Sequence, residues 1–304
     1  MNDNQPLADR QSGAGALFAF FAFLIWGLSP IYWKALHGVG AFEIILHRIL
    51  WSFAFLMPLV CVGRRWLEFK KAIKSPNMLF ILLITSILVG GNWLIYIWAV
   101  NNGRVLQASL GYYINPLVNI VLGMVFLRER LRRAQAAAVI LATLGVLNLT
   151  FRYGVFPWVS LALAFSFGVY GLVRKVAAVG ALVGLTVETL LLTIPAGIWV
   201  VHLHQIQSGA FMHSGIKTDL LLLGTGILTA TPLLLFNLGA RRITLASLGF
   251  IQYTAPTGML VLGITMFGEP FTRIQAVTFG LIWTALAIYS WDTVRANREH
   301  GTKR

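Results

Sequence analysis

Ten long apolar runs divide the 304-residue chain and constrain its fold more than any other feature. Each run has about 18 to 22 residues, the length that an α-helix needs to cross a hydrocarbon core roughly 30 Å thick. Hydrophobic residues make up 58% of the chain and charged residues 11%, whereas a soluble domain carries about 25% charged residues. The chain is therefore expected to be an all-α integral membrane protein without a separate soluble domain. The ten predicted spans are 14–33, 43–62, 78–100, 107–127, 134–151, 155–173, 181–202, 219–239, 245–267 and 274–291.

The two ends of the chain are polar. Residues 1–13 precede the first apolar run and are expected to form a cytoplasmic tail. That run is longer than the apolar part of a signal peptide and lacks a convincing cleavage site, so it is predicted to stay in the protein as the first span. Residues 292–304 form a basic tail, also expected in the cytoplasm.

Lys and Arg are unevenly distributed between the two sides of the predicted membrane. If the N-terminus is cytoplasmic, eighteen of the 24 basic residues fall on the inside, five fall outside and Arg48 lies within a span. The positive-inside rule then predicts that both termini are in the cytoplasm. A bacterial inner membrane is the expected location. The net charge of +14 is explained by this topology and by contact with anionic lipids. No nucleic-acid partner is expected.

The two halves of the chain resemble each other. The segment Ala108–Gly111 (ASLG) recurs as Ala246–Gly249. Further matches follow over about 30 residues and involve glycine, proline, glutamate and glutamine, which rarely match together by chance. The matched pairs are Pro116 with Pro256, Gly123 with Gly263, Glu129 with Glu269, Arg133 with Arg273 and Gln135 with Gln275.

These matches predict two five-helix repeats, at residues 14–151 and 155–291. Because five is an odd number, the second repeat would cross the membrane in the opposite sense. Inverted repeats are the architecture of many secondary transporters, whose substrate sites lie near the midplane where the repeats meet. Pro116 and Pro256 are predicted to kink equivalent helices beside such a cavity. Kinks that serve only packing are the alternative.

Aromatic and amide side chains gather in the spans around these prolines. Aromatic walls with a few amides suit a small amphipathic ligand, although the same residues could simply pack in the core. The predicted lining residues of the substrate cavity are Asn92, Trp93, Tyr96, Asn101, Tyr112, Tyr113, Asn115, Asn119, Tyr170, Gln252 and Tyr253.

Four ionisable residues within the apolar runs are candidates for charge recognition or proton coupling. A charged side chain raises the free energy of membrane insertion by about 2.5–3.5 kcal/mol at the centre of a membrane helix, so such residues are usually functional or paired. Glu43 and His47 share one helix face, and Arg48 follows about 100° around the helix; they could bind a substrate carboxylate or carry a proton. Glu43 could instead serve the helix dipole and Arg48 could reach the interface. Glu188 lies deeper, where a carboxylate must be protonated, paired or facing water.

Sequence motifs of several enzyme classes are absent. The chain has no GxxxxGK[ST] phosphate loop, no HExxH and no GxSxG, and all four aspartates lie at or beyond span ends. The single cysteine, Cys61, allows neither an intrachain disulfide nor a cysteine-based metal site. We therefore expect no enzyme activity, catalytic residue, metal or cofactor.

Four segments carry a family resemblance that covers most of the chain. They are HRILWS (His47–Ser52), GGNWLIYIWAVN (Gly90–Asn101), ASLGYYINPLVNIVLG (Ala108–Gly123) and FSFGVYGLVRK (Phe165–Lys175). They resemble the RarD branch of the EamA family, within the drug/metabolite transporter superfamily. The resemblance implies a ten-helix inverted-repeat permease that exports small metabolites or drugs.

One family motif is kept only in part. The Gly-Glu pair that follows the fourth span of each half is present at Gly268-Glu269 but reads Arg128-Glu129 in the first half. The resemblance therefore does not imply identical loop geometry in the two halves, and it leaves the substrate undefined.

The favoured hypothesis is a secondary transporter that exports a small molecule by alternating access, with possible proton coupling. A passive facilitator or exchanger of amino acids or metabolites is the first alternative. An intramembrane enzyme acting on lipid-linked substrates and a sensor or structural membrane protein are more distant ones. Membrane lipids and a small-molecule substrate are the expected partners, and both monomer and homodimer remain open.

Overall fold

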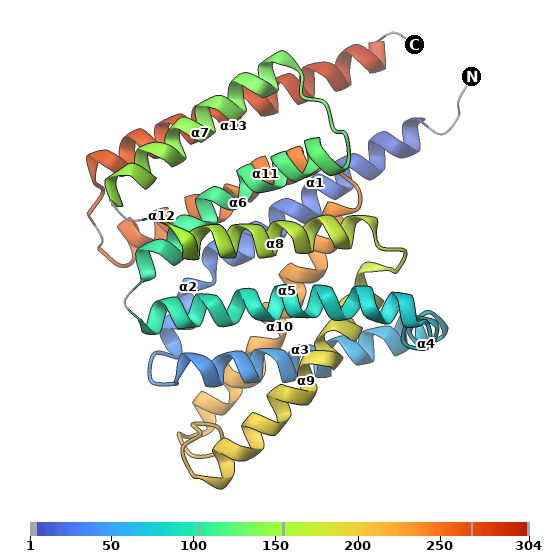
Figure 1. The fold of residues 1–304 in the computed structure, drawn as a ribbon, viewed down its shortest axis with the longest axis vertical. Coiled ribbons are helices and arrows are strands. Elements are labelled where there is room, and N and C mark those ends of the chain that lie inside the picture. Colours follow the sequence, from blue (N-terminus) through green and yellow to red (C-terminus); the bar gives the residue numbers. More distant parts are fainter. Residues whose placement is uncertain (1–4, 103, 154–155, 269, 303–304) are drawn as a thin grey trace.

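The protein is a bundle of long helices. The computed structural model describes residues 5–102, 104–153, 156–268 and 270–302, and those residues form helices and connecting turns without any β-strand (Figure 1). The helices are α1 (Gln5–Leu28), α2 (Pro30–Ala35), α3 (Ala41–Val62), α4 (Trp66–Lys74), α5 (Pro76–Asn101), α6 (Val105–Phe126), α7 (Arg133–Tyr153), α8 (Trp158–Val176), α9 (Ala181–Gln205), α10 (Ile216–Ala240), α11 (Leu245–Gln252), α12 (Thr254–Thr265) and α13 (Arg273–Thr302).

Ten helical segments of the described chain are long and apolar enough to cross a membrane. The first combines α1 and α2, and the ninth combines α11 and α12, whereas α4 is too short to span. The prediction of ten membrane helices is confirmed, with most ends within three residues of those expected. The sixth span is Trp158–Val176 rather than 155–173, and the tenth extends to Ala296.

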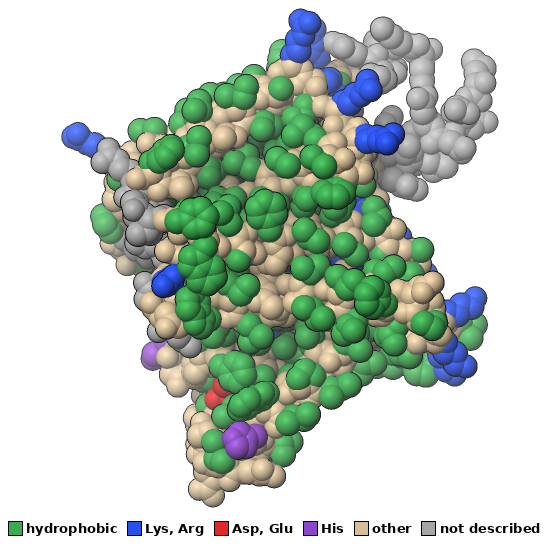
Figure 2. Space-filling view, in the orientation of Figure 1, with side chains coloured by type: hydrophobic (Ala, Val, Ile, Leu, Met, Phe, Trp, Pro, Cys, Tyr) green, Lys and Arg blue, Asp and Glu red, His purple; other side chains and the backbone are tan. Residues whose placement is uncertain are grey.

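Apolar side chains cover the outside of the bundle as well as its core. In the most apolar part of each span, only 28% to 56% of the residues are buried. Figure 2 shows hydrophobic side chains over most of the visible face, with Lys and Arg toward its edges. Such an exterior is stable in lipid but would be costly in water. It confirms a multi-pass membrane protein.

Proline interrupts two of the spans. The ninth span breaks at Tyr253, three residues before Pro256, because that proline has no N–H to donate to the carbonyl of Gln252. The first span breaks at Ser29, immediately before Pro30, a break that the sequence analysis did not anticipate. By contrast, α6 continues through Pro116. The equivalent prolines of the two halves therefore differ in local effect.

Most helix contacts occur in pairs that correspond when the halves are exchanged. α1 packs against α10 and the α11–α12 span, and its counterpart α8 packs against α5 and α6. α3 packs against α10, and its counterpart α9 packs against α5. Three contacts join a helix to its own counterpart: α3–α9, α6–α11 and α7–α13, the last pair along the upper edge of Figure 1. Two structurally related five-span units would produce this pattern.

Candidate functional site

Arg48 is held within the bundle by helices from both halves. It lies in the first half of α3, and its Nε donates a 2.9 Å hydrogen bond to Oγ1 of Thr229 on α10. Its guanidinium carbon lies 4.9 Å from the ring centroids of both Trp33 and Trp93. Arginine stacks well on aromatic faces because its planar cation is weakly hydrated. The two tryptophans thus give the charge a partial substitute for water.

Two tyrosines extend this aromatic surface. The rings of Tyr96 on α5 and Tyr112 on α6 meet edge to face, with centroids 6.2 Å apart, and both lie near Arg48. Each of the two side chains is 36% exposed. The cluster around Arg48 therefore includes accessible aromatic surface. We call the six residues Trp33, Arg48, Trp93, Tyr96, Tyr112 and Thr229 the Arg48 cluster.

The charge of Arg48 has no acidic counterpart in the described part of the chain. Four ion pairs occur there, and none includes Arg48. Thr229 is its one hydrogen-bond partner among those residues, so the two terminal amino groups of the guanidinium make no such bond to protein. An unpaired cation at this depth is costly. The Arg48 cluster is therefore the best candidate site for an anionic group of a ligand.

Glu43 and His47 lie on α3 but have different partners from Arg48. Oε1 of Glu43 accepts hydrogen bonds from the backbone N–H groups of Ala210 (2.7 Å) and Phe211 (3.1 Å), in the turn between α9 and α10. Nδ1 of His47 accepts a 3.1 Å hydrogen bond from Trp51, and its Nε2 lies 3.8 Å from Oε1 of Glu43. The charged group predicted from sequence thus separates into a loop-binding pair and a separate arginine.

Glu188 lies in a fully buried polar network. Oε1 of Glu188 accepts a 2.6 Å hydrogen bond from Thr85 and lies 3.3 Å from Nε of Arg174. Oε2 accepts a 3.2 Å hydrogen bond from the hydroxyl of Tyr170, which in turn accepts one of 2.9 Å from Asn237. We call these residues the Glu188 network. Of the three states expected for this carboxylate, the structure shows the paired one.

Arg174 was not recognised by sequence analysis as a buried residue. It lies near the end of a predicted span, where basic residues usually face the cytoplasm, but the helix continues to Val176 and Arg174 is 0% exposed. Gly184 makes this position possible, because a side chain at residue 184 would overlap the guanidinium. A spacing of fourteen residues between Arg174 and Glu188 carries no helical signal, so only the packing of α8 on α9 pairs them.

The amides near the two prolines join the halves directly. Nδ2 of Asn119 on α6 donates a 2.7 Å hydrogen bond to Oε1 of Gln252 on α11 and lies 3.3 Å from Oδ1 of Asn115. The helices are in close contact here, since a Cβ on Gly249 would lie 2.5 Å from the carbonyl oxygen of Pro116. These predicted lining residues thus meet at the interface of the halves, as a packed contact.

The remaining predicted lining residues have varied surroundings. Asn92 donates 2.9 Å hydrogen bonds to the carbonyl of Leu163 and to Ser166, so it ties α5 to α8. The Tyr253 hydroxyl donates to the carbonyl of Tyr113 at 3.3 Å. The side chain of Asn101 lies outside the described residues, as does Glu269. Trp93, Tyr96 and Tyr112 are the predicted lining residues that the Arg48 cluster contains.

Two members of the Arg48 cluster were missed by sequence analysis. Trp33 lies at a span end, where an interfacial tryptophan is the usual expectation. Thr229 is one of several threonines in the spans, most of which can bond to their own helix backbone. Neither residue carries a signal in the linear sequence. Their role follows from their positions beside Arg48, which only the folded structure shows.

Two further carboxylates of the first half bind helix N-termini of the second half. Oε1 of Glu68 accepts a 2.8 Å hydrogen bond from the N–H of Gly180, before α9. The carboxylate of Glu129 accepts from the N–H groups of Leu245 (2.8 Å) and Ala246 (3.1 Å), at the start of α11. Free N–H groups at a helix start favour an anion. With Glu43, three carboxylates thus fasten one half to the other.

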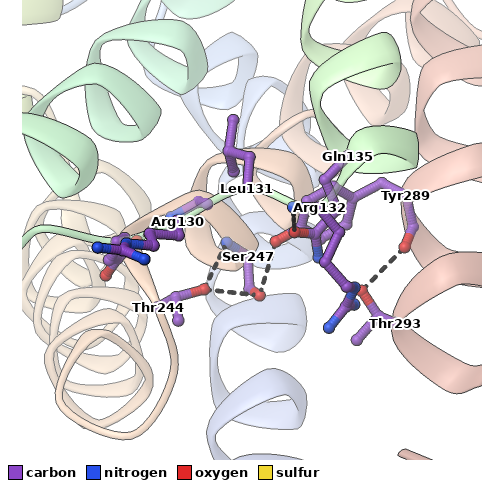
Figure 3. A pocket seen from close by; sticks show the side chains of 10 residues that line it. Arg130, Leu131, Arg132, Gln135, Thr244, Ser247, Tyr289 and Thr293 are labelled. Carbon is purple, nitrogen blue, oxygen red and sulfur yellow. Dashed lines mark hydrogen bonds between the residues drawn. The ribbon is translucent and has the colours of Figure 1, made fainter. Parts of the chain in front are cut away.

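A surface pocket of about 240 Å³ adjoins Glu129. It lies between α7, α11 and α13, and Figure 3 shows Thr244 and Ser247 hydrogen bonded within it, near Arg132 and Gln135. The hydroxyl oxygens of Ser247 and Tyr289 are 3.0 Å apart. Many polar groups that line this pocket already form hydrogen bonds to other groups of the protein. In this respect the pocket differs from the Arg48 cluster, whose guanidinium has amino groups without a hydrogen bond to the described residues.

In Figure 1, the start of α1, the end of α13 and α4 lie on the same side of the bundle, and α4 carries Lys70, Lys71 and Lys74. Arg241, after α10, donates hydrogen bonds to the carbonyls of Ala177 (2.8 Å) and Val179. Burial lowers the pKa of Arg241, and repulsion from Arg174 and Arg242 lowers it further. This end carries the charge expected of the side that faces anionic lipids.

Comparisons with known proteins agree with the fold and with the family resemblance. Residues 13–151 match the EamA-like transporter family. The chain is 47% identical to Protein RarD of Salmonella typhi, over 95% of this chain and 99% of the relative. It is 45% identical to an uncharacterized transporter of Vibrio cholerae, over 95% of each chain. A solved structure described as "Crystal structure of protein" superposes with a TM-score of 0.70 and 18% identity, covering 91% and 96% of the two chains, and supports the fold alone.

The chain therefore belongs to the EamA-like transporter family, in its RarD branch. The resemblance stated from its sequence motifs is confirmed. Its relatives are bacterial and its spans are apolar, which supports a multi-pass protein of a bacterial inner membrane with a role in transport.

Proposed function

We propose that this member of the EamA-like transporter family is a secondary transporter that exports small organic metabolites or drugs. One observation carries the proposal: the Arg48 cluster is polar, partly accessible and built by helices of both halves. A side chain of the second half, Thr229, orients the arginine of the first half. Relative movement of the halves would therefore change the site, as alternating access requires.

The proposed movement is a rocking of two inverted repeats, residues 14–151 and 155–291. With both termini in the cytoplasm, Glu68 and Glu129 would fasten the halves on the cytoplasmic side and Glu43 on the external side. Opening to either side would break the carboxylate contacts on that side. Each contact is a set of charge-assisted hydrogen bonds that can form again.

Proton coupling is proposed as the source of energy. Glu43, His47 and Glu188 are the candidate carriers, and Glu188 has the stronger physical argument because it is buried at 0% exposure. Its ion pair with Arg174 would open if the carboxylate took up a proton. A facilitator or exchanger needs no such group, so its transport would not depend on a pH gradient.

Purified protein in liposomes tests these alternatives. Coupled transport predicts that an imposed pH gradient drives substrate accumulation, and that Glu188→Gln or Glu43→Gln removes accumulation while leaving counterflow. Accumulation that ignores the pH gradient in the wild type would exclude coupling and support the facilitator. Absence of any saturable substrate movement would count against transport itself.

A further inference from the structure

The Arg48 cluster also constrains what kind of molecule it can bind. Its guanidinium carries a full charge, and its two terminal amino groups make no hydrogen bond to the described residues. Carboxylates match this fork-shaped donor with two parallel hydrogen bonds. A neutral ligand would leave the charge of Arg48 uncompensated, and a cationic ligand would add to it.

The aromatic members define the other end of the ligand. The faces of Trp33 and Trp93 lie against the guanidinium itself, at 4.9 Å. The rings of Tyr96 and Tyr112 lie beside them and remain partly accessible. A ligand whose carboxylate contacts Arg48 would therefore place its apolar body against the two tyrosines, where burial of flat apolar surface is favourable.

Charge near the cluster distinguishes monoanions from zwitterions. An amino acid bound through its carboxylate would bring its ammonium group within a few ångströms of Arg48. None of the described carboxylates forms an ion pair with Arg48, so the ammonium would find no acidic partner among them. Glu43, close in sequence, is already bound to the α9–α10 turn.

From this geometry we infer that the substrate class is small organic monocarboxylates with an aromatic or aliphatic body. The inference rests on the proposed transport function and adds the chemical identity of the group that Arg48 recognises. It predicts that 3-phenylpropionate binds more tightly than its uncharged amide, 3-phenylpropanamide. It also predicts tighter binding of 3-phenylpropionate than of phenylalanine, which has an additional ammonium group, or of phenethylamine, which is a cation.

Binding to purified protein in phosphatidylcholine nanodiscs tests this ranking. Wild-type protein should bind 3-phenylpropionate at least about tenfold more tightly than 3-phenylpropanamide, since charge-assisted bonds to a carboxylate are lost in the amide. In Arg48→Gln this ratio should fall to about one, and in Arg48→Lys, which keeps the charge but loses the fork, it should be intermediate. Because the ratio is measured within each folded variant, a change in protein yield does not affect it.

Arg104 provides a matched control. It is also an arginine stacked near two tryptophans, Trp98 at 5.2 Å and Trp158 at 5.7 Å, but it lies outside the Arg48 cluster. Arg104→Gln should keep the wild-type ratio. The inference is overturned if wild type does not prefer 3-phenylpropionate, if Arg48→Gln keeps the preference, or if phenylalanine or phenethylamine binds more tightly.

The anionic group bound by Arg48 could also come from a lipid headgroup. A second set of nanodiscs, which contain phosphatidylglycerol, distinguishes a lipid from a free carboxylate. If phosphatidylglycerol displaces 3-phenylpropionate from wild type and Arg48→Gln abolishes this sensitivity to lipid, the occupant is a lipid phosphate and the inference is overturned. Counterflow in liposomes then separates the two proposals. Movement of neutral or cationic compounds that is independent of Arg48 would refute the substrate class but keep the transport function.

Discussion

Arg48 and Arg174 are both arginines within membrane-spanning helices, but their surroundings are opposite. Arg174 is 0% exposed, and its Nε lies 3.3 Å from Oε1 of Glu188. Arg48 is only half-buried, has two tryptophan faces beside it and forms no ion pair within the described chain. Arg174 thus has an acidic partner within the protein, whereas Arg48 has none among the described residues.

This difference separates a charge that the protein pairs internally from a charge that has no acidic partner among the described residues. A buried ion pair adds little stability relative to apolar residues, but losing one partner leaves a bare charge and is strongly destabilising. Arg48 forms no ion pair in the described chain, so its substitution leaves no bare charge behind. Substitution of Arg174 should therefore mainly lower stability, and substitution of Arg48 should mainly weaken ligand binding. The first and last of the four substitutions below test this, and the other two measure contacts between the halves for comparison.

The largest loss of stability is expected for Arg174→Ala. Removing the cation leaves Glu188 charged and buried, at a cost of about 3–5 kcal/mol in the free energy of unfolding. Unfolding in mixed detergent and dodecyl sulfate measures this change. The double variant Arg174→Met with Glu188→Leu should recover most of it, because neither charge then remains. An equal loss in single and double variants would show that the pair itself is stabilising.

A smaller loss is expected for Gln252→Leu, at the contact between α6 and α11. The side-chain N–H of Asn119 loses its 2.7 Å acceptor, which costs about 1–3 kcal/mol for a buried group. The low end of that range applies, since Asn115 lies 3.3 Å away as an alternative acceptor. Gln275→Leu is the control, because its hydrogen bonds to Thr272 are exposed. A larger effect in the control would contradict the interpretation.

Glu129→Ala should cost about 1 kcal/mol, as loss of a helix N-terminal cap does. The N–H groups of Leu245 and Ala246 lose the carboxylate that binds them, although water can reach this end of the bundle. Thermal unfolding measures the effect, and Glu129→Gln, which keeps one acceptor oxygen, should lose less. If glutamine is no better than alanine, the charge rather than the hydrogen bond stabilises the helix start.

The smallest effect on stability is expected for Arg48→Gln, at less than about 1 kcal/mol. The variant loses a hydrogen bond to Thr229 and two stacking contacts, but it also removes a charge that is costly to hold in the membrane. Unfolding and ligand binding are measured on the same sample. A loss comparable to that of Arg174→Ala would make Arg48 a structural residue and remove the distinction between the two arginines.

The spans could be predicted from sequence because their physical cause is local. In lipid, a segment must satisfy its own backbone hydrogen bonds, so an apolar run of sufficient length forms a helix whatever its neighbours are. Proline acts locally as well, and Pro256 breaks its helix as expected. Pro116 lies within a continuous α6, whose close neighbour is Gly249 of the other half. Local chemistry was therefore insufficient to predict whether each of two equivalent prolines breaks its helix.

The candidate site was only partly predictable. Glu188, Arg48 and the aromatic residues were recognised because polar groups within apolar runs are conspicuous. Their partners were not, since Thr85 and Thr229 are separated from them by more than a hundred residues. Sequence alone determined how many helices cross the membrane and which polar side chains they carry into it. Tertiary structure alone decided which of those charges has an acidic partner and which has none among the described residues, because the cost of a buried charge depends on its neighbours in space.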